Sequence, residues 1–351
     1  MTSPLMNAWT LDGYGADTDG FMLSRFPRPA PGPGEVLIRV RASSYNPIES
    51  KIRVGALQFA PPFPAILNGD VAGRIEAIGS GVDAFAIGDL VYGCCGGFLG
   101  HQGALAEYMV ARAESLARMP EELSFEEAAA LPIASITAWY ALVDRAKLKR
   151  GERVLILGGT GGVGHVGVQL AVALGADVVA ACGTDEKCAV ARSLGAAEAY
   201  NYHDTDIENV VQRYTEGEGF DLVFDTAGGS SLGDALRAAR FGGQVATIGA
   251  RGSHDLSPGQ GRGVTLHMVM MLDAFVTGRG WAHYGEILRE VAELVSAGQL
   301  RPLVDSARFT FDRVGEAHDY AAMGIHAGKI ALSYPDSAEL PMIPESAKHE
   351  G

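Results

Sequence analysis

A glycine-rich segment stands where a buried strand is expected to pass into a helix. Residues Gly159–Gly164 read GTGGVG and fit the spacing G-x-G-x-x-G, directly after the apolar run Arg153–Leu157. In this context one glycine allows a tight turn, one lets the backbone approach a pyrophosphate, and one lets helix and strand pack closely. The free N–H groups at the start of the helix favour an anion. The segment predicts a dinucleotide site, and a tight turn without a ligand is the alternative.

The residues after the second expected strand indicate which dinucleotide would bind. A site for NAD usually ends that strand with an acidic residue that binds the ribose diol. Here the strand at 177–182 runs into Gly183 and Thr184, which carry no charge, and Lys187 follows. A small residue, a hydroxyl group and an ammonium group suit a 2′-phosphate. The two acidic residues after Thr184 oppose this interpretation, but the first turn of a helix commonly carries acidic residues. We therefore predict NADP(H) rather than NAD(H).

The candidate residues lie in a stretch where strands and helices alternate. From Gly151 onward, continuous apolar runs alternate with helical segments, which predicts a parallel sheet covered by helices on both faces. Before that, short β-branched runs between glycine turns favour a partly antiparallel β domain. Ser124 and Glu127 have the spacing of a capping box and predict a helix start. A last strand at 328–333 stands apart from the alternating block and is a candidate to return to the first domain.

Composition restricts the class of the chain and its partners. The 351 residues carry 28 basic and 42 acidic side chains, a formal charge of −14 without a long block of either sign. Nucleic acid is not expected as a partner, because its recognition needs a clustered basic face. No apolar stretch reaches the length of a membrane span and no secretory signal is visible, so no membrane partner is expected. Four cysteines do not suggest a disulfide framework, and a reducing cytoplasm is the simplest setting.

Several motifs follow one another in the order of a known enzyme family. They are NPIESKIRVG (Asn46–Gly55), GDVAGRIEAIGSGVDAFAIGDLVYG (Gly69–Gly93), GALAEYMVA (Gly103–Ala111), GGTGGVGHVGVQLAVALGA (Gly158–Ala176) and GKIALS (Gly328–Ser333). From Pro31 to Ser333 the chain resembles the medium-chain dehydrogenase/reductases, in particular the zinc-free quinone oxidoreductase branch that includes zeta-crystallin. The resemblance implies an α/β fold with a GroES-like, mostly β catalytic domain and a doubly wound Rossmann domain. The expected boundaries are 1–132, 133–272, a return over 273–340, and a tail at 341–351.

The resemblance also implies a set of cofactor contacts. It places the pyrophosphate against Gly161, Gly162, Val163 and Gly164, and the 2′-phosphate among Gly183, Thr184, Lys187 and Tyr202. It places the nicotinamide beside Thr137, Ile248, Gly249, His267 and Met268, and it brings Lys329 toward the cofactor from the C-terminal strand. Asn46 is expected at the floor of the substrate cleft.

The residues at the metal positions of the family predict a site without metal. Zinc-dependent relatives carry a cysteine at the cleft, a His-Glu pair after a glycine, and a loop of four cysteines. This chain has Ser43–Asn46 at the cleft, Gly69–Val71 (GDV) at the second position, and only the adjacent Cys94 and Cys95. His101 is a lone imidazole, expected at the surface. Without a Lewis acid, hydride transfer suits an electron-poor acceptor such as a quinone or an α,β-unsaturated carbonyl compound.

Two residues are candidates for stabilising negative charge on the acceptor. Asn46 is the first, although asparagine before proline is also a common turn. Tyr45 is the second, and a packed aromatic side chain is equally consistent with that position. Leu57 stands where many relatives have a tyrosine, which weakens any reaction that needs that phenol as a proton donor. Glu49 is expected to be structural rather than an acid or base.

Three functions stay open on this basis. The first is an NADPH-dependent reductase of quinones or enones. The second is an enzyme of the same fold that acts on an enoyl-thioester or on an alcohol/aldehyde couple. The third is a nucleotide-binding protein without turnover, as in lens crystallins. Family members are often dimers joined through their nucleotide domains, so a homodimer is expected.

Overall fold

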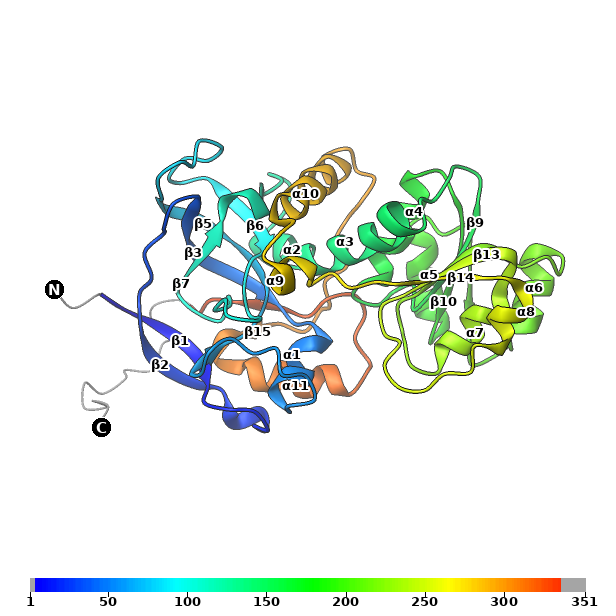
Figure 1. Cartoon of the computed structure of the whole chain (residues 1–351), viewed down its shortest axis with the longest axis horizontal. Coiled ribbons are helices and arrows are strands. Elements are labelled where there is room, and N and C mark those ends of the chain that lie inside the picture. Colours follow the sequence, from blue (N-terminus) through cyan, green and yellow to red (C-terminus); the bar gives the residue numbers. More distant parts are fainter. Residues whose placement is uncertain (1–3, 336–351) are drawn as a thin grey trace.

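Six parallel strands form the sheet of the nucleotide lobe in the computed structural model, which describes residues 4–335 (Figure 1). Their order is β11–β10–β9–β12–β13–β14. The strands are β9 (Arg153–Leu157), β10 (Asp177–Cys182), β11 (Glu198–Asn201), β12 (Phe220–Asp225), β13 (Ala239–Thr247) and β14 (Thr265–Met268). This order reverses direction between β9 and β12, and in such sheets ligands bind at the carboxyl ends beside that point. The predicted doubly wound parallel sheet is confirmed.

Helices cover both faces of this sheet, as continuous apolar strands require. They are α4 (Gly164–Ala173), α5 (Asp185–Ser193), α6 (Ile207–Thr215), α7 (Ser231–Ala238) and α8 (Ser257–Arg262). In β9, Val154 and Ile156 belong to one buried apolar cluster, whereas Leu155 belongs to another on the opposite face. Successive side chains of a strand point to opposite faces, so each face of β9 is packed.

The other lobe is built mainly from antiparallel strands. A seven-stranded sheet has the order β15–β16–β3–β5–β6–β8, with β7 paired to β3, and a three-stranded sheet has the order β2–β1–β4. The strands are β1 (Leu5–Leu11), β2 (Met22–Pro27), β3 (Glu35–Ser44), β4 (Ala65–Ile66), β5 (Asp70–Ile78), β6 (Leu90–Cys94), β7 (Tyr108–Arg112), β8 (Leu116–Arg118), β15 (Phe309–Thr310) and β16 (Ala331–Ser333). The predicted partly antiparallel β region is present.

The end of the described chain returns to this first lobe. Strand β16 pairs antiparallel with β3, so that Ala331 lies opposite Ser44. The helices of the two terminal parts are α1 (Pro47–Arg53), α2 (Phe125–Ala129), α3 (Pro132–Trp139), α9 (Asp273–Thr277), α10 (Trp281–Ser296) and α11 (Val314–Ala322). The predicted capping box is confirmed at α2, where Ser124 Oγ accepts Glu127 N at 3.2 Å. The expected tail at 341–351 lies outside the described residues.

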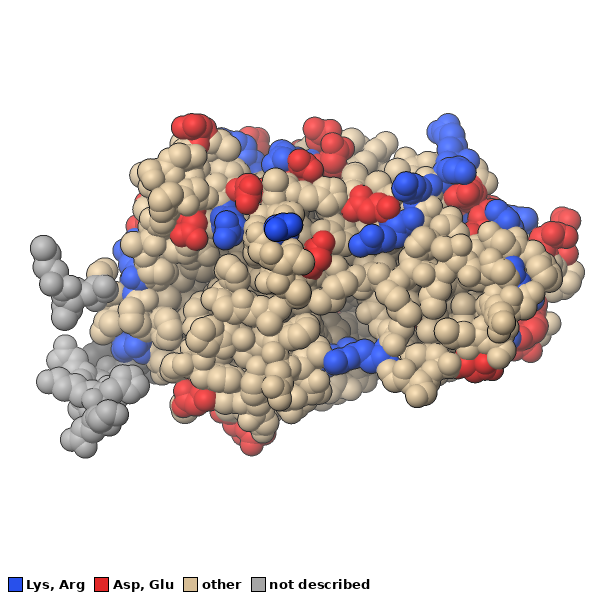
Figure 2. All heavy atoms as spheres, viewed as in Figure 1, with Lys and Arg blue, Asp and Glu red and all other residues tan. Residues whose placement is uncertain are grey.

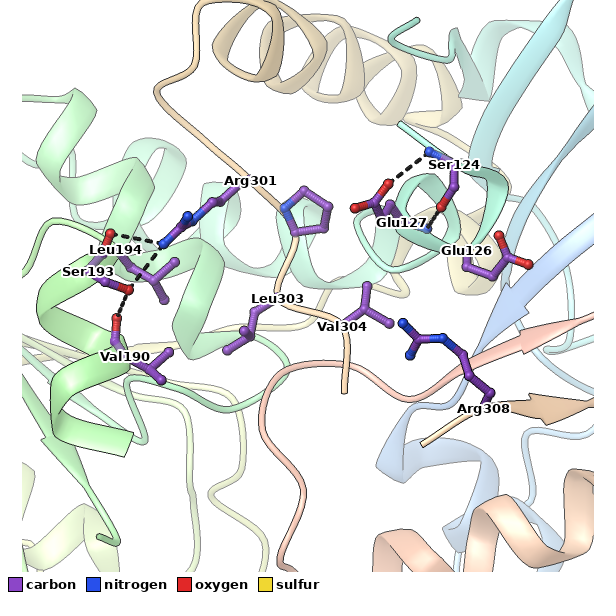
Figure 3. Close-up of a pocket in the computed structure, with 11 residues that line it drawn as sticks. Ser124, Glu126, Glu127, Val190, Ser193, Leu194, Arg301, Leu303, Val304 and Arg308 are labelled. Atoms are coloured by element: carbon purple, nitrogen blue, oxygen red, sulfur yellow. Dashed lines mark hydrogen bonds between the residues drawn. The ribbon is translucent and has the colours of Figure 1, made fainter. Parts of the chain in front are cut away.

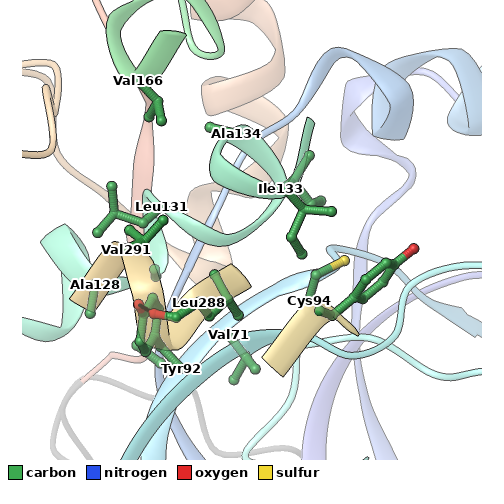
Figure 4. Close-up of a cluster of buried hydrophobic side chains, with 14 of the residues drawn as sticks. Val71, Tyr92, Cys94, Ala128, Leu131, Ile133, Ala134, Val166, Leu288 and Val291 are labelled. Atoms are coloured by element: carbon green, nitrogen blue, oxygen red, sulfur yellow. Dashed lines mark hydrogen bonds between the residues drawn. The ribbon is translucent and has the colours of Figure 1, made fainter. Parts of the chain in front are cut away.

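The two lobes share one apolar core where α3 and α4 meet (Figure 4). Val166 of α4 lies beside Leu131, which directly precedes α3, and Leu288 of α10 lies near Val71 of β5. All four side chains are buried. The space-filling view shows acidic and basic side chains interspersed, with the surface hollowed between the lobes (Figure 2). Among residues 4–335, no helix combines the length and apolar character that a bilayer crossing needs.

Candidate active site

The glycine-rich turn joins β9 to α4 at the point where the strand order reverses. A side-chain carbon on Gly164 would lie 2.0 Å from Gly158 O, and one on Gly159 would lie 2.7 Å from the Cβ of Ala180. Both contacts are too short for any residue but glycine. Val163 at the N-cap of α4 makes no side-chain capping hydrogen bond. The His165 N–H donates to Gly161 O at 3.1 Å, whereas within residues 4–335 no backbone acceptor faces the amides of Gly162, Val163 and Gly164, which are therefore available to an anionic group such as a phosphate.

Substituting Gly164 by alanine is expected to distort this turn. The added methyl group would collide with Gly158 O, and overpacking of this kind costs about 1–3 kcal/mol. We expect the free energy of unfolding to fall by that amount and NADPH affinity to fall at least about tenfold, measured by urea denaturation and by cofactor titration. Gly261→Ala is the control, because a Cβ there meets nothing within 4 Å. Equal behaviour of the two variants would contradict the assigned role of Gly164.

The four residues predicted around the 2′-phosphate come together at the end of β10. A Cβ on Gly183 would lie 2.9 Å from the hydroxyl oxygen of Tyr202. Thr184 caps α5, where its Oγ1 accepts Lys187 N at 3.2 Å. Lys187 Nζ donates to His326 O at 2.9 Å. No carboxylate follows β10 directly, because Cys182 is succeeded by Gly183.

The two acidic residues that opposed the NADP prediction lie in the first turn of α5. Asp185 and Glu186 both occupy that turn. Hydrogen bonds from the Glu186 N–H and from Thr184 lower the pKa of the Glu186 carboxyl group. This is the expected behaviour of an acid at a helix start, and it accounts for these residues without a ribose contact.

The residues predicted on the nicotinamide side lie on α3 and along β13 and its neighbour β14. Ile248 and Gly249 follow β13, and Gly249 O accepts Gly229 N at 2.8 Å across the carboxyl ends of β12 and β13. Thr137 is buried in α3, and its hydroxyl donates to Ile133 O. His267 and Met268 lie on the edge strand β14, which pairs with β13 so that Met268 lies opposite Thr247, the residue before Ile248. The His267 ring bonds Gln244 Oε1 at 2.8 Å.

A buried ion pair lies where the first lobe meets the glycine-rich turn, at the position expected for the floor of the substrate cleft, and is called the cleft floor below. Lys329 Nζ lies 3.1 Å from Asp70 Oδ2 and also contacts Asn46 Oδ1. The side chains are 3% exposed for Lys329 and fully buried for Asp70. Asp70 accepts two further short hydrogen bonds, from Ser44 Oγ at 2.6 Å and from Ile133 N at 2.8 Å. The carboxylate is thus fixed by three elements, the end of β3, the start of α3 and the segment before β16.

Lys329 and the residue before it also contact the nucleotide lobe. A Cβ on Gly162 would lie 3.2 Å from Lys329 Cδ, and Gly328 N donates to Thr160 O at 2.7 Å. The aliphatic part of the lysine therefore passes along the glycine-rich turn. Its ammonium group lies in the first lobe, beside Asn46 and Asp70, and this lobe is called the catalytic lobe below.

The side-chain amide of Asn46 is fully engaged. Its Nδ2 donates to Asp70 Oδ2 at 2.9 Å and to Glu49 Oε1 at 3.2 Å, and its Oδ1 accepts from Lys329. Neither amide hydrogen remains for a substrate, so this structure does not support the predicted donor role. Glu49 forms a capping box with Asn46 at the start of α1, as expected of a structural residue. Burial raises the pKa of Glu49 to about 8, while the charge of Lys329 opposes the rise.

Tyr45 points away from this floor. Because Asn46 is extended, neighbouring side chains along this segment project in opposite directions. The Tyr45 hydroxyl lies 2.9 Å from Ser50 Oγ, which in turn lies 2.8 Å from His318 Nδ1 on α11. Burial raises the pKa of the phenol. The side chain of Tyr45 therefore does not lie with that of Asn46 and Lys329. It corresponds to the packed aromatic residue that was the alternative for this position.

Three contributors to this site were not singled out from the sequence. The sequence marks Asp70 only by its position, where zinc-dependent relatives have a metal-binding histidine. Ser44 lies beside Asn46 in sequence and carried no separate signal. The carbonyl of His326 has no sequence signature, since any residue supplies one.

Two buried histidines predict a loss of stability in acid. Burial lowers the pKa of His165 to about 4 and that of His318 to about 3. In the unfolded chain both histidines become protonated near pH 6.5, whereas in the folded protein they stay neutral until the pH is much lower. The unfolded state therefore binds more protons, and the free energy of unfolding falls as the pH drops below 6.5. His165 alone accounts for roughly 3 kcal/mol between pH 6.5 and 4.

Urea denaturation at pH 7.5 and at pH 5 measures this effect. We expect His165→Asn and His318→Asn to reduce the difference between the two pH values, since asparagine keeps a polar atom near Nδ1. The exposed His203→Asn is the control and should leave the difference unchanged. A wild-type protein equally stable at both pH values would contradict the assignment.

A separate groove lies at the junction of the lobes (Figure 3). It has a volume of about 580 Å³ and lies between α5, α2 and the segment 301–308. Arg301 crosses toward α5, where its guanidinium donates to Ser193 O at 3.2 Å and to Ser193 Oγ at 3.1 Å. None of the predicted site residues lines this groove.

Two family models match the two lobes. One is described as an alcohol dehydrogenase GroES-like domain and matches residues 32–121, and one is described as a zinc-binding dehydrogenase and matches residues 162–297. A quinone oxidoreductase of Pongo abelii is 32% identical over 305 residues, which cover 87% of this chain and 90% of the relative. The chain belongs to the medium-chain dehydrogenase/reductase family.

Solved structures of the family have the same architecture. An alcohol dehydrogenase superfamily protein from Novosphingobium aromaticivorans has a TM-score of 0.89 and 39% identity, covering 94% of this chain and all of that one. A mycobacterial protein solved in complex with NADPH has a TM-score of 0.82 and 26% identity, covering 93% of this chain and 99% of that one. This medium-chain dehydrogenase/reductase is therefore an oxidoreductase with a GroES-like domain and a nicotinamide-nucleotide-binding Rossmann fold.

The name of one matching family model raises the question of zinc. Within residues 4–335, no three or more His, Cys, Asp and Glu side chains converge in an arrangement that could hold a metal ion. At the cleft floor, the oxygens of Asp70 and Asn46 already surround an ammonium group. Cys94 lies opposite Asp70 in the β5–β6 pair, but burial raises the pKa of its thiol well above the usual value. The oxygens of this floor thus contact a cation that the chain itself supplies.

Proposed function

We propose that this medium-chain dehydrogenase/reductase is an NADPH-dependent reductase of quinones or other α,β-unsaturated carbonyl compounds that works without a metal ion. The observation that carries the proposal is the buried pair of Lys329 and Asp70 at the cleft floor, where an ammonium group occupies the oxygen donors. The similarity to a quinone oxidoreductase supports the same class of acceptor.

The cofactor assignment rests on the end of β10. When bound, NADPH supplies a hydride to the acceptor. The amides of Gly162, Val163 and Gly164 at the start of α4 would bind the pyrophosphate, whereas the Gly161 amide donates to Gly158 O at 2.8 Å. Gly183 leaves room beside Tyr202, and Lys187 supplies the positive charge for the 2′-phosphate. A similar protein was solved with NADPH, in agreement with this choice.

The residues of the chain contribute position and exclusion of water. Quinones and enones delocalise the negative charge that reduction adds, so they need less help from a Lewis acid than a simple ketone. The shared core between α3 and α4 holds the glycine-rich turn against the catalytic lobe. Such fixed placement of two reactants is a large part of catalysis in reactions of this kind.

We also propose a homodimer in the cytoplasm, with domain boundaries near residues 132, 272 and 340. Strand β14 is the edge of the nucleotide sheet, and Met268 and Met270 are 58% and 43% exposed there. An unpaired edge with apolar side chains can pair with a second copy. Light scattering of the purified protein measures the oligomeric state, and a monomer would exclude the dimer.

A panel of acceptors tests the proposed reaction. Purified protein is mixed with NADPH and 1,4-benzoquinone, 9,10-phenanthrenequinone, a 2-alkenal or crotonyl-CoA, and the absorbance of the reduced nicotinamide is followed. Turnover of the quinones or the alkenal is expected. Turnover of crotonyl-CoA alone would indicate an enoyl-thioester reductase. Turnover of none would indicate a nucleotide-binding protein without catalysis.

A further inference from the structure

The ammonium group of Lys329 has one hydrogen to spare. A lysine ammonium carries three N–H donors. Two of them face Asn46 Oδ1 and Asp70 Oδ2. Among residues 4–335, no third acceptor lies within hydrogen-bond distance of Nζ. A buried donor without an acceptor lowers the stability of the folded protein. We therefore expect the third N–H of Lys329 to bind an acceptor atom of a ligand.

The surroundings fix this ammonium group in one place. Asp70 is held by Ser44 Oγ and Ile133 N, and Asn46 is held by Glu49 and Asp70. Lys329 is 3% exposed, so water does not screen its charge. Because this charge is already fixed and dehydrated before the reaction, no free energy is spent on reorienting its surroundings when negative charge develops next to it.

The position of Lys329 joins the two halves of the site. Its Cδ packs on Gly162 of the glycine-rich turn, and its Nζ ends beside Asn46 on the catalytic lobe. The two donors predicted from the sequence are engaged elsewhere: Asn46 with Asp70 and Glu49, and Tyr45 with Ser50. Lys329 therefore remains as the donor at the meeting point of cofactor turn and cleft floor.

We propose that the third N–H of Lys329 binds the carbonyl oxygen of the acceptor and stabilises the oxyanion that reduction creates, with Asn46 and Asp70 as positioning residues. This inference rests on the proposed function. Reduction forms a C–H bond on the acceptor from the hydride of NADPH, which is oxidised to NADP⁺. The electron pair of the acceptor double bond moves to oxygen, and the oxyanion is later protonated by water. Lys329 keeps its own proton and supplies a hydrogen bond and a positive charge.

The binding of a phenol tests this role without cofactor or turnover. A phenolate resembles the oxyanion of a reduced quinone, and 4-nitrophenol absorbs in the visible range only as the phenolate. We titrate 4-nitrophenol bound to the protein across pH and follow its absorbance. In the wild type, the adjacent ammonium should lower the apparent pKa of the bound phenol by about 1–3 units.

Variants at the pair decide the outcome. Lys329→Met should abolish the shift of the bound phenol. Because this change leaves Asp70 buried without its cation, Lys329→Met/Asp70→Asn, which removes both charges, is the second variant and should behave in the same way. Lys149→Met changes an exposed lysine and should retain the full shift. Absence of the shift in the wild type, or its persistence in both Lys329 variants, would overturn the proposal.

Kinetics separate this role from cofactor binding. Lys329→Met should lower kcat for an enone by about 100-fold or more, with less effect on the dissociation constant of NADPH. A loss confined to NADPH affinity would mean that Lys329 only binds the cofactor, and would overturn the proposal. If the wild type reduced no acceptor yet shifted the phenol, the proposed function would fail while the oxyanion site would stand.

Discussion

Replacing Asp70 by alanine is expected to lower the free energy of unfolding by about 3–5 kcal/mol. The change leaves the ammonium of Lys329 buried without its counter-charge, and it removes the acceptor for Ser44 Oγ and Ile133 N. Each buried donor left without a partner adds to the loss. Urea denaturation followed by circular dichroism gives the measurement.

Two comparison variants make this result specific to the buried pair. Lys329→Met/Asp70→Asn removes both charges and should recover a large part of the loss, because no uncompensated charge remains. Asp89→Ala breaks the pair with Arg118, whose side chain is 59% exposed, and should cost no more than about 1 kcal/mol. If Asp70→Ala lowered the free energy of unfolding as little as Asp89→Ala does, the buried pair at the cleft floor would not stabilise the protein more than an exposed pair.

Replacing Lys187 by alanine is expected to raise the dissociation constant of NADPH by about 10- to 100-fold and to leave that of NADH nearly unchanged. A hydrogen bond between an ammonium and a phosphate is worth about 1.5–3 kcal/mol, and only NADPH carries the 2′-phosphate. In the described structure, Lys187 Nζ donates to His326 O, so it must exchange this partner for the phosphate.

Fluorescence titration of each cofactor measures the two affinities. Lys149→Ala serves as the control for the loss of one exposed positive charge, and both affinities should be retained. Raising the ionic strength should weaken the binding of NADPH more than the binding of NADH in the wild type. This difference between the two cofactors should be smaller in Lys187→Ala. Equal losses for the two cofactors would show that Lys187 does not recognise the phosphate.

The nucleotide lobe was predictable because its determinants are local. Apolar runs alternating with helices predict a parallel sheet covered on both faces, and the six strands have that arrangement. The turn at Gly164 needs glycine because of an atom only six residues away, Gly158 O. The capping box of Ser124 and Glu127 joins residues only three positions apart. Patterns of this range are complete within a short window of the sequence.

The cleft floor was harder to predict because its partners are distant in sequence. Asn46 looks like a free donor until Lys329, 283 residues further on, is placed against its oxygen. The direction of Tyr45 follows from the helix α11 that packs beside it, through Ser50 and His318. The position of Met268 next to Ile248 follows from the register between β13 and β14, which places it opposite Thr247. None of these relations is contained in residue type or spacing.

The return of β16 to β3 has a consequence for how the protein is made. Domains emerge from the ribosome and fold in order from the N-terminus. Strand β3 and the glycine-rich turn are synthesised long before Gly328 and Lys329, which connect them. During translation, the carboxylate of Asp70 therefore has no cation beside it until Lys329 has been synthesised. A chain that stalls before residue 329 lacks the ammonium group of this pair and the contact between Gly328 and Thr160.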